Sequence, residues 1–408
     1  MSGETEAGAR GRRAPGRRVV VGNGRLVTPA GIVDDGLVIT DGEKIVYAGA
    51  AASAGGFLEE TRGAEELDAG GGYICPGFID GHVHGGGGAD VMDATAEAIA
   101  QLARTHAVHG TTRLVATTMS APLEHLLDVA AAVRPMVGVD TGGARVLGVH
   151  LEGPYLNPAR RGAHNAAYLR PPDPAELERL YEALGRALVT VTLAPELPGA
   201  EAAIRWLAGR GVNVSIGHTA ATYEQALAAV DAGARAATHA FNAMEGLHHR
   251  APGCLGAVLV DGRVRAELIA DGVHVHPGAM RLLYRCKGAA GVMLVTDGMR
   301  AVGCPPGEYL LGDLPVVVRD GQARLKDDPA ALAGSVLTMA EAVRVMVRSV
   351  GVPLVEAVGM ATWTPAEGLG VAGSLGRLSP GYEADLVVLD EDLAVRMTMV
   401  AGEVVFST

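Results

Sequence analysis

The chain alternates eight short apolar segments with amphipathic helical segments, and this alternation constrains the fold more than any other feature. Strands that alternate with helices are typical of a parallel sheet with helices packed outside it. Eight such strands favour a (β/α)8 barrel, an α/β fold of the TIM type, whose active site lies at the carboxyl ends of the strands. The predicted strands span residues 73–84, 111–118, 145–152, 188–196, 212–218, 234–239, 265–274 and 291–297.

The two ends of the chain have a different sequence pattern from the middle. Residues 19–74 consist of short β segments separated by turn residues, and residues 372–408 have the same pattern. We therefore expect both ends to fold together into one small β domain beside a barrel of residues 75–371. Residues 1–18 are rich in Arg and Gly and lack an apolar segment, so we expect a disordered tail there.

Charge and composition narrow the class of partner. The formal net charge is −12, which argues against a nucleic-acid or anionic membrane partner and favours a small molecule. The sequence shows no uninterrupted apolar stretch of about 18 residues, so we expect no membrane span. The four cysteines show no CxxC spacing, which favours a reducing compartment, and we expect a cytoplasmic protein.

Histidines and carboxylates stand at the ends of six of the eight predicted strands. They are His82 and His84 on the first strand, Glu152 on the third, His218 on the fifth, His239 on the sixth, His274 on the seventh and Asp297 on the eighth. In a barrel these ends converge on one mouth. A single histidine in such a place is more often a buried ring bonded to a carbonyl, so the prediction of a shared site rests on the set.

This set of residue types predicts a metal centre. Glu152, His218 and His239 would hold one catalytic ion such as Zn²⁺, Fe²⁺ or Mn²⁺ and leave a coordination position open. His82 and His84 lie two residues apart, so in a strand they point the same way. With Glu152 bridging and Asp297 completing the shell, they would hold a second ion.

Two further residues are candidates for catalysis. Asp297 is placed to take a proton from a water and return it to a leaving group, although a helix N-cap would also explain an aspartate after a strand. Residues 150–164 lack helical periodicity and predict a loop over the site. His164 on this loop could polarise a carbonyl or stabilise an oxyanion; the alternative is a surface histidine.

Residues 238–256 predict a polar loop with candidate substrate contacts. Asn242, His248, His249 and Arg250 follow the predicted ligand within a few residues. Arginine is suited to a phosphate or a carboxylate because its guanidinium presents a fork of donors. A solvated loop would explain any one of these residues equally well. His274 and His276 form a second His-x-His pair, in which we assign His274 to the site and leave His276 either behind the site or on the surface.

The same motifs, in this order, resemble those of the N-acetylglucosamine-6-phosphate deacetylases of the amidohydrolase superfamily over nearly the whole chain. The segments are PGFIDGHVHGGGGADVMD, GVHLEGPYLNPARRGAHN, SIGHTAAT, THAFNAMEGLHHRAPG, DGVHVHP, LVTDG, LAGSVLTM and GRLSPGYEADLVVLD. The first and last alone indicate only an amidohydrolase. The segment after Glu152, together with THAFNAM, narrows the resemblance to the amino-sugar deacetylases.

The resemblance implies a reaction and roles for the residues. A divalent metal (Zn, Fe or Mn, one or two ions) supplies a hydroxide that attacks the acetamide carbonyl of N-acetylglucosamine 6-phosphate, and glucosamine 6-phosphate and acetate are released. Asp297 acts as general base and then as general acid. The substrate contacts it implies are His164 at the carbonyl and Asn242, Ala243, His274 and Arg250 at the sugar phosphate. Arg250 reaches the neighbouring subunit's site, so a homodimer is implied.

Three rival interpretations stay open. N-acetylgalactosamine 6-phosphate would undergo the same chemistry, and Arg300, near Asp297 where the family commonly has a small residue, leaves the epimer undecided. A cyclic-amide hydrolase would commonly carry a carboxylated lysine at strand four, which here ends in residues 194–196, Ala-Pro-Glu. A non-catalytic scaffold that oligomerises is the third, but it gives no physical reason to keep so many polar groups facing one cavity.

Overall fold

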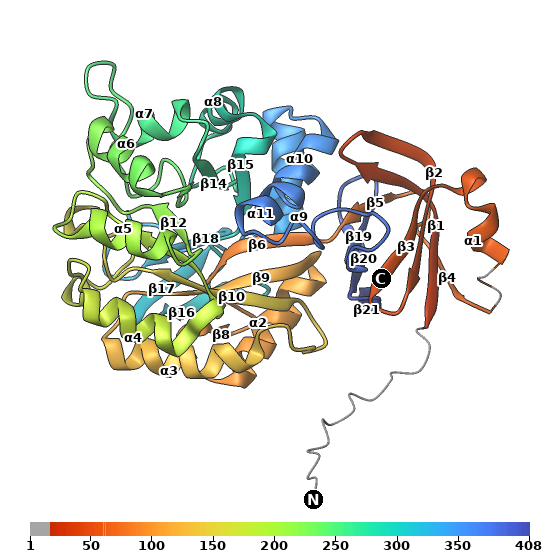
Figure 1. The fold of residues 1–408 in the computed structure, drawn as a ribbon, viewed down its shortest axis with the longest axis horizontal. Coiled ribbons are helices and arrows are strands. Elements are labelled where there is room, and N and C mark those ends of the chain that lie inside the picture. The colour runs from red at the N-terminus through yellow and green to blue at the C-terminus, as the bar shows by residue number, and fades with distance from the viewer. Residues whose placement is uncertain (1–16, 60, 62) are drawn as a thin grey trace, which may run out of the picture.

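The computed structural model describes residues 17–59, 61 and 63–408 and contains a barrel beside a separate β sheet (Figure 1). The disordered tail predicted for residues 1–18 falls, up to residue 16, outside the described residues. Arg18 already belongs to the first strand. Within the described part of the chain, no helix is both long enough and apolar enough to cross a membrane.

Eight parallel strands form the barrel and confirm the predicted fold class. They run in the order β15-β14-β13-β12-β11-β10-β9-β6. Their bounds are β6 (Phe78–Val83), β9 (Thr111–Thr118), β10 (Arg145–Glu152), β11 (Leu188–Leu193), β12 (Asn213–Ile216), β13 (Ala236–Ala237), β14 (Arg265–Ile269) and β15 (Val292–Val295). The ring closes just beyond β15, where Val83 and Gly298 form a parallel bridge and the Asp297 N–H donates to the His82 carbonyl at 3.0 Å.

Helices connect the strands and pack their apolar faces on the barrel. They are α2 (Ala96–Val108), α3 (Leu123–Val133), α4 (Pro174–Leu184), α5 (Ala200–Ala208), α6 (Tyr223–Ala232), α7 (Gly253–Val260) and α8 (Pro277–Lys287), followed by α9 (Met339–Val345), α10 (Leu354–Met360) and α11 (Trp363–Gly368). Local sequence fixes where they begin: Thr222 and Gln225 form a capping box at α6, and the Asp173 side chain caps α4 ahead of Pro174. The apolar sides of strands and helices share one large buried core.

Six of the eight predicted strands are shorter in the structure than the sequence pattern indicated, and the first and seventh differ most. The first, residues 73–84, is divided: β5 (Tyr73–Pro76) pairs in the other sheet and β6 begins the barrel. Gly77 makes this change of sheet possible, because a Cβ there would lie 2.3 Å from the Thr112 side chain. The seventh predicted strand, residues 265–274, ends at Ile269, so His274 lies on the loop that follows.

Both ends of the chain build the second sheet, as predicted. Its order is β21-β20-β19-β5-β1-β2-β3, and β4 pairs with β1. The strands are β1 (Arg18–Thr28), β2 (Gly31–Asp41), β3 (Lys44–Ala50), β4 (Glu65–Asp68), β5, β19 (Leu386–Leu389), β20 (Val395–Val400) and β21 (Glu403–Ser407), with the short helix α1 (Gly55–Glu59) after β3. The predicted boundary between residues 74 and 75 falls inside β5.

A buried ion pair joins this sheet to the barrel. Arg113 on β9 donates from Nε to Asp385 Oδ2 at 2.5 Å and from NH2 to Oδ1 at 3.0 Å. Both residues are 5% exposed. Asp385 also accepts the Ala401 N–H at 2.8 Å. The pair is therefore bidentate and well satisfied, which is the geometry in which Arg and Asp interact most strongly.

An antiparallel sheet that the sequence reading missed is inserted after β15. It consists of β16 (Gly307–Leu311), β17 (Leu314–Arg319) and β18 (Gln322–Leu325). The turn between β16 and β17 approaches the loop after β9, where a Cβ on Gly312 would lie 3.3 Å from Met119. The insertion adds a wall to the mouth of the barrel. A smaller antiparallel pair, β7 (Gly85–Gly86) and β8 (Ala89–Asp90), turns back at Gly87 and Gly88.

The Arg113 and Asp385 pair generates a stability prediction. Asp385→Ala removes the bidentate partner of the buried Arg113 guanidinium and leaves it only the longer contact from NH2 to Glu383 Oε2 at 3.4 Å, so we expect the free energy of unfolding to fall by about 3–5 kcal/mol. The control is Glu201→Ala, which breaks an exposed pair with Arg205 and should change stability by less than ~0.5 kcal/mol. Urea unfolding of the three proteins measures both; equal small losses would contradict this role of the buried pair.

Candidate active site

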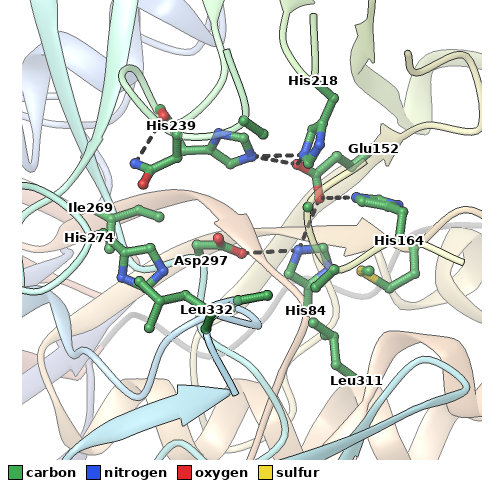
Figure 2. A pocket seen from close by; sticks show the side chains of 18 residues that line it. His84, Glu152, His164, His218, His239, Ile269, His274, Asp297, Leu311 and Leu332 are labelled. Atoms are coloured by element: carbon green, nitrogen blue, oxygen red, sulfur yellow. Dashed lines mark hydrogen bonds and ion pairs between the residues drawn. The ribbon is translucent and has the colours of Figure 1, made fainter. Parts of the chain in front are cut away.

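Three of the candidate side chains follow their strands at the same distance. His218, His239 and Asp297 stand two residues after the last residue of β12, β13 and β15. Their φ values are 48°, 30° and 49°, in the left-handed region where Asp and His are enriched among non-glycine residues. The chain therefore turns directly after each strand, and the three side chains remain over the barrel mouth (Figure 2). Strained backbone of this kind clusters at functional sites.

Glu152, the last residue of β10, lies at the centre of the site and is 2% exposed. Its Oε1 is 3.2 Å from His218 Nε2 and 3.0 Å from His239 Nε2, and these two nitrogens are 3.1 Å apart. Its Oε2 is 3.2 Å from His84 Nε2 and 3.4 Å from His82 Nε2. A single carboxylate thus faces two imidazole pairs, one with each oxygen.

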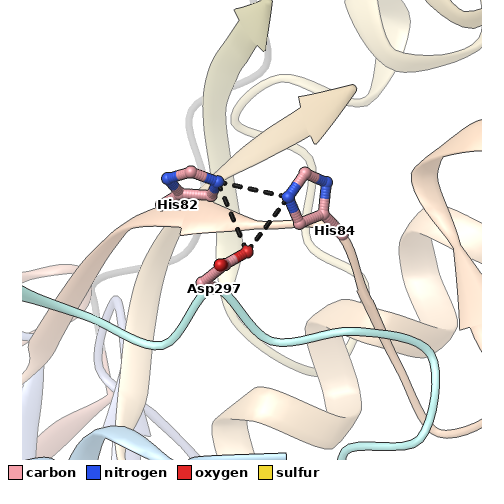
Figure 3. Close-up of side chains that lie close together, drawn as sticks. All are labelled: His82, His84 and Asp297. Atoms are coloured by element: carbon pink, nitrogen blue, oxygen red, sulfur yellow. Dashed lines mark hydrogen bonds and ion pairs between the residues drawn. The ribbon is translucent and has the colours of Figure 1, made fainter. Parts of the chain in front are cut away.

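Asp297 joins the second of these pairs (Figure 3). Its Oδ1 is 3.1 Å from His84 Nε2 and 3.5 Å from His82 Nε2, and the two ring nitrogens are 3.2 Å apart. The three side chains form a group whose ligand atoms are close enough to share one metal ion. The structure therefore brings together both ligand sets that the sequence suggested.

The groups that face the Nδ1 atoms determine which ring nitrogen carries the proton and which offers a lone pair. Behind three of the four rings, Nδ1 faces an oxygen that only accepts. These oxygens are the Arg160 carbonyl 2.8 Å from His218, the Thr117 carbonyl 3.2 Å from His84 and Glu267 Oε2 3.1 Å from His82. Each neutral ring therefore carries its proton on Nδ1 and leaves a lone pair on Nε2. An acceptor behind the ring is the usual arrangement for a metal-binding histidine.

The distances between the facing atoms fit a metal centre. Neighbouring ligand atoms, each about 2.0–2.2 Å from one ion, lie roughly 3 to 3.5 Å apart. The separations around Glu152 and Asp297 run from 3.0 to 3.5 Å. Lone pairs that face each other this closely repel unless a cation lies between them, so the donor set fits one or two divalent ions.

The electrostatics of the buried groups also favour a cation. Burial alone would raise the pKa of Glu152, but His82 and the other surrounding imidazoles hold it well below the usual carboxyl range. Burial would likewise raise the pKa of Asp297, and His82 and His84 bring it to about 2. In turn, despite burial, Glu152 and Asp297 hold the pKa of His82 well above its usual value. A field that attracts a proton this strongly also attracts a metal ion.

His164 has the opposite arrangement from the histidines paired around Glu152. The Ser120 backbone N–H, which can only donate, lies 3.2 Å from His164 Nδ1, and Ser120 Oγ is 2.8 Å from the same atom. Burial lowers the pKa of His164 to about 4, so the ring is neutral near pH 7. The neutral ring therefore carries its proton on Nε2, and this atom is 3.5 Å from Glu152 Oε2 at the site. His164 thus presents a hydrogen-bond donor beside the candidate metal centre.

A cavity of about 250 Å³ opens over these groups. Its polar side chains are His84, Glu152, His164, His218, His239, Asn242, His274 and Asp297, and its apolar ones include Met119, Ala243, Ile269, Leu311 and Leu332. His274 Nδ1 lies 2.6 Å from Asp271 Oδ2. This partner leaves His274 Nε2 as an acceptor on the other ring edge when the ring is neutral. The cavity therefore offers hydrogen-bonding groups suited to a sugar.

Several residues considered from the sequence do not line this cavity, among them the exposed His248 and His249. Arg250 is exposed on its loop, and its NH1 lies 2.8 Å from His249 Nε2. Arg300 donates from NH2 to Asp93 Oδ1 at 2.6 Å and from NH1 to Asp93 Oδ2 at 3.0 Å, and NH1 also donates to the Gly88 carbonyl. Its side chain is therefore held outside the cavity lining. His276 caps the start of α8.

Sequence reasoning missed several residues that support the site. Ser120 stands two residues after β9, the same spacing as His218 after β12, and this spacing is a signal that could have found it. Glu267 is a carboxylate within an apolar strand, which is itself a sign of a buried partner. Glu196, at the position considered for a lysine, binds the Thr219 hydroxyl at 2.5 Å and the Ala220 N–H at 2.7 Å, and so secures the turn after His218.

Comparisons with known proteins agree with this geometry. Residues 73–405 match the model of the amidohydrolase family. The chain is 42% identical over 333 residues to an N-acetylglucosamine-6-phosphate deacetylase of Vibrio furnissii, with 82% of this chain and 83% of that protein covered. It is 44% identical over 330 residues to an N-acetylgalactosamine-6-phosphate deacetylase of Escherichia coli O157:H7, with 81% and 87% covered. The solved structure of the Mycobacterium smegmatis N-acetylglucosamine-6-phosphate deacetylase with N-acetylglucosamine 6-phosphate has a TM-score of 0.89 and 38% identity, and covers 96% of this chain and 100% of that one.

The central position of Glu152 generates a metal-binding prediction. Adding Zn²⁺ or Mn²⁺ to metal-free protein should stabilise it, by about 2.7 kcal/mol at a free ion concentration 100 times the Kd. Glu152→Gln removes the charge that both imidazole pairs share and should abolish most of this stabilisation. Glu176→Gln, in a carboxylate that pairs with Arg170 away from the cavity, is the control. Thermal unfolding and bound metal are measured together; equal metal content in both variants would contradict the assignment.

Proposed function

This chain belongs to the amidohydrolase family, and from that premise we infer that it is an N-acetylglucosamine-6-phosphate deacetylase. The enzyme hydrolyses the acetamide of the sugar phosphate and releases acetate and glucosamine 6-phosphate. The observation that carries this assignment is the convergence of Glu152, Asp297 and four imidazoles beside a neutral histidine donor in one cavity. Relatives with this activity in their names cover more than four fifths of the chain.

Amidohydrolases generally use a divalent metal, and the chain has groups that suit one. We propose that Glu152, His218 and His239 hold one Zn, Fe or Mn ion and that His82 and His84, with Glu152 and Asp297, hold a second. Such an ion, when bound, lowers the pKa of its water toward about 7 and polarises a carbonyl oxygen.

Two residues move or hold protons in the proposed reaction. His164 donates from Nε2 to the substrate carbonyl oxygen and stabilises the negative charge that develops there. Asp297 accepts a proton from the attacking water and then gives that proton to the sugar nitrogen as the C–N bond breaks. The net reaction adds one water across the amide bond, so acetate and an amine result.

The sugar and its phosphate require different contacts. Asn242, Ala243 and His274 line the cavity and are proposed to bind the sugar. Among the described residues that line this cavity there is no lysine or arginine, although a phosphate is normally held by a cation. We propose that Arg250 of a second subunit supplies it.

A homodimer is therefore part of the proposal. Large apolar side chains are exposed near the Arg250 loop and on the helices that follow it: Leu247 is 52% exposed, Val260 at the end of α7 is 68% exposed, and Leu282 on α8 is 43% exposed. Apolar residues in such positions suit a subunit interface.

A cytoplasmic location also stays a prediction. The four cysteines are free thiols, as in a reducing compartment.

The galactosamine epimer is the second candidate substrate because one relative named for it is 44% identical. Arg300 does not decide between the epimers, since its guanidinium is bound to Asp93. The choice therefore falls to groups that line the cavity. Comparing kcat/KM for the two N-acetyl sugar phosphates on one preparation identifies the better substrate; a higher value for the galactosamine compound would reassign the enzyme.

The proton-transfer role of Asp297 generates a kinetic prediction. Asp297→Asn keeps the shape of the side chain but removes its basicity, so kcat for acetate release should fall by about 10²–10⁴-fold. The ion held by Glu152, His218 and His239 should stay bound, and elemental analysis checks this. The control is Asp93→Asn, a carboxylate that holds Arg300 outside the cavity, which should keep most of its activity. Near-full turnover by Asp297→Asn would remove it from this role.

The proposed subunit exchange generates a mixing prediction. Arg250→Ala should raise KM for the phosphorylated sugar, and Asp297→Asn should be nearly inactive. In a mixed dimer the Arg250→Ala chain keeps its Asp297 and receives Arg250 from its partner, so one complete site is restored. Random mixing should return roughly a quarter of wild-type activity at low substrate. No recovery, with exchange of subunits demonstrated, would place Arg250 in its own chain's site.

A further inference from the structure

We propose that Met119 and Leu311 form a wall that limits the length of the acyl group this enzyme removes, an inference that rests on the proposed deacetylase function. A second cavity of about 310 Å³ adjoins the active-site cavity, and Met119 lines both. Leu311 lines the first cavity, and the next residue, Gly312, lines the second. These side chains therefore separate the two spaces.

The position of the proton-transferring groups places the acyl group on this side of the cavity. The carbonyl oxygen must lie within reach of His164, and the nitrogen within reach of Asp297. In Figure 2, His274 lies on one side of Asp297, whereas His164 and Leu311 lie on the other. Because the sugar extends from the nitrogen toward His274, the methyl group of the acetamide points the opposite way. Met119 directly precedes Ser120, which holds His164, so it stands at that end.

The two wall residues are buried and apolar. Met119 is 5% exposed and Leu311 is 2% exposed. They come from elements far apart in the sequence, the loop after β9 and the end of β16. These elements approach closely at the residue after Leu311: Gly312 has φ +55°, and a Cβ added there would lie 3.3 Å from both Cβ and Cγ of Met119. The Met119 N–H lies 3.2 Å from Met92 Sδ on the far side.

This geometry makes the acyl subsite a selective one. An acetyl methyl ends at the wall, whereas each further methylene must displace a packed side chain. One methylene more or less in an apolar pocket changes kcat/KM by about 10- to 200-fold. The second cavity supplies space just beyond Met119, so shortening this side chain joins the two spaces and admits a longer chain.

Competition between substrates tests the proposal. N-acetyl-, N-propionyl- and N-butyryl-glucosamine 6-phosphate are mixed in equal amounts with metal-loaded protein, and the released acids are counted by NMR. The ratio of products gives the ratio of kcat/KM values and does not depend on the fraction of folded or metal-loaded protein. The variants are Met119→Ala and Leu311→Ala. Leu310→Ala is the matched control, because Leu310 is the neighbour of Leu311 on β16 but is 45% exposed.

We expect wild type and Leu310→Ala to favour acetate over propionate by at least about 10-fold, and either wall variant to raise the ratios of propionate to acetate and of butyrate to acetate by at least about 10-fold. If Met119→Ala does not fold, Met119→Val removes less volume and tests the same wall. Unchanged ratios in the folded variants at both positions overturn the inference and leave the proposed function intact. No acid released by wild type from any of the three overturns the proposed function and this inference with it.

Discussion

The structure of the site depends on the position of one carboxylate. Glu152 is buried and reaches two imidazole pairs at once, with His218 and His239 at 3.0–3.2 Å from one oxygen and His82 and His84 at 3.2–3.4 Å from the other. These residues come from four different strands or the turns after them, so the arrangement exists only when the barrel has closed. A buried charge in such surroundings is stable only when it is paired or binds a metal.

The histidines around Glu152 divide into two kinds according to what stands behind them. Where a carbonyl or carboxylate oxygen lies behind the ring, as for His218, the neutral imidazole offers a lone pair to the centre. Where the Ser120 N–H lies behind the ring, as for His164, the imidazole offers a proton instead. The same side chain can therefore bind a metal or stabilise an oxyanion, and the outer partner decides which.

Sequence patterns identified the fold and most of the candidate site because they depend on local features. Apolar runs that end in His218, His239 and Asp297 place these residues at strand ends, and the fold brings strand ends together. Patterns did not identify Glu267 or Ser120, because their importance comes from partners 185 and 44 residues away in the chain. Residues 307–325 were also missed, although Gly312-Asp313 and Asp320-Gly321 are hairpin turn signals. The first predicted strand was too long because a change of sheet at Gly77 depends on the neighbouring Thr112.

We propose that Glu152 bridges two metal positions. It is tested most directly by anomalous X-ray diffraction at the zinc absorption edge, from crystals of metal-free protein soaked in Zn²⁺. Two anomalous peaks are predicted, one between Glu152, His218 and His239 and the other between Glu152, His82 and His84, with one carboxylate oxygen at each. Bound zinc that lies away from Glu152, or two peaks of which neither contacts this carboxylate, would contradict the account.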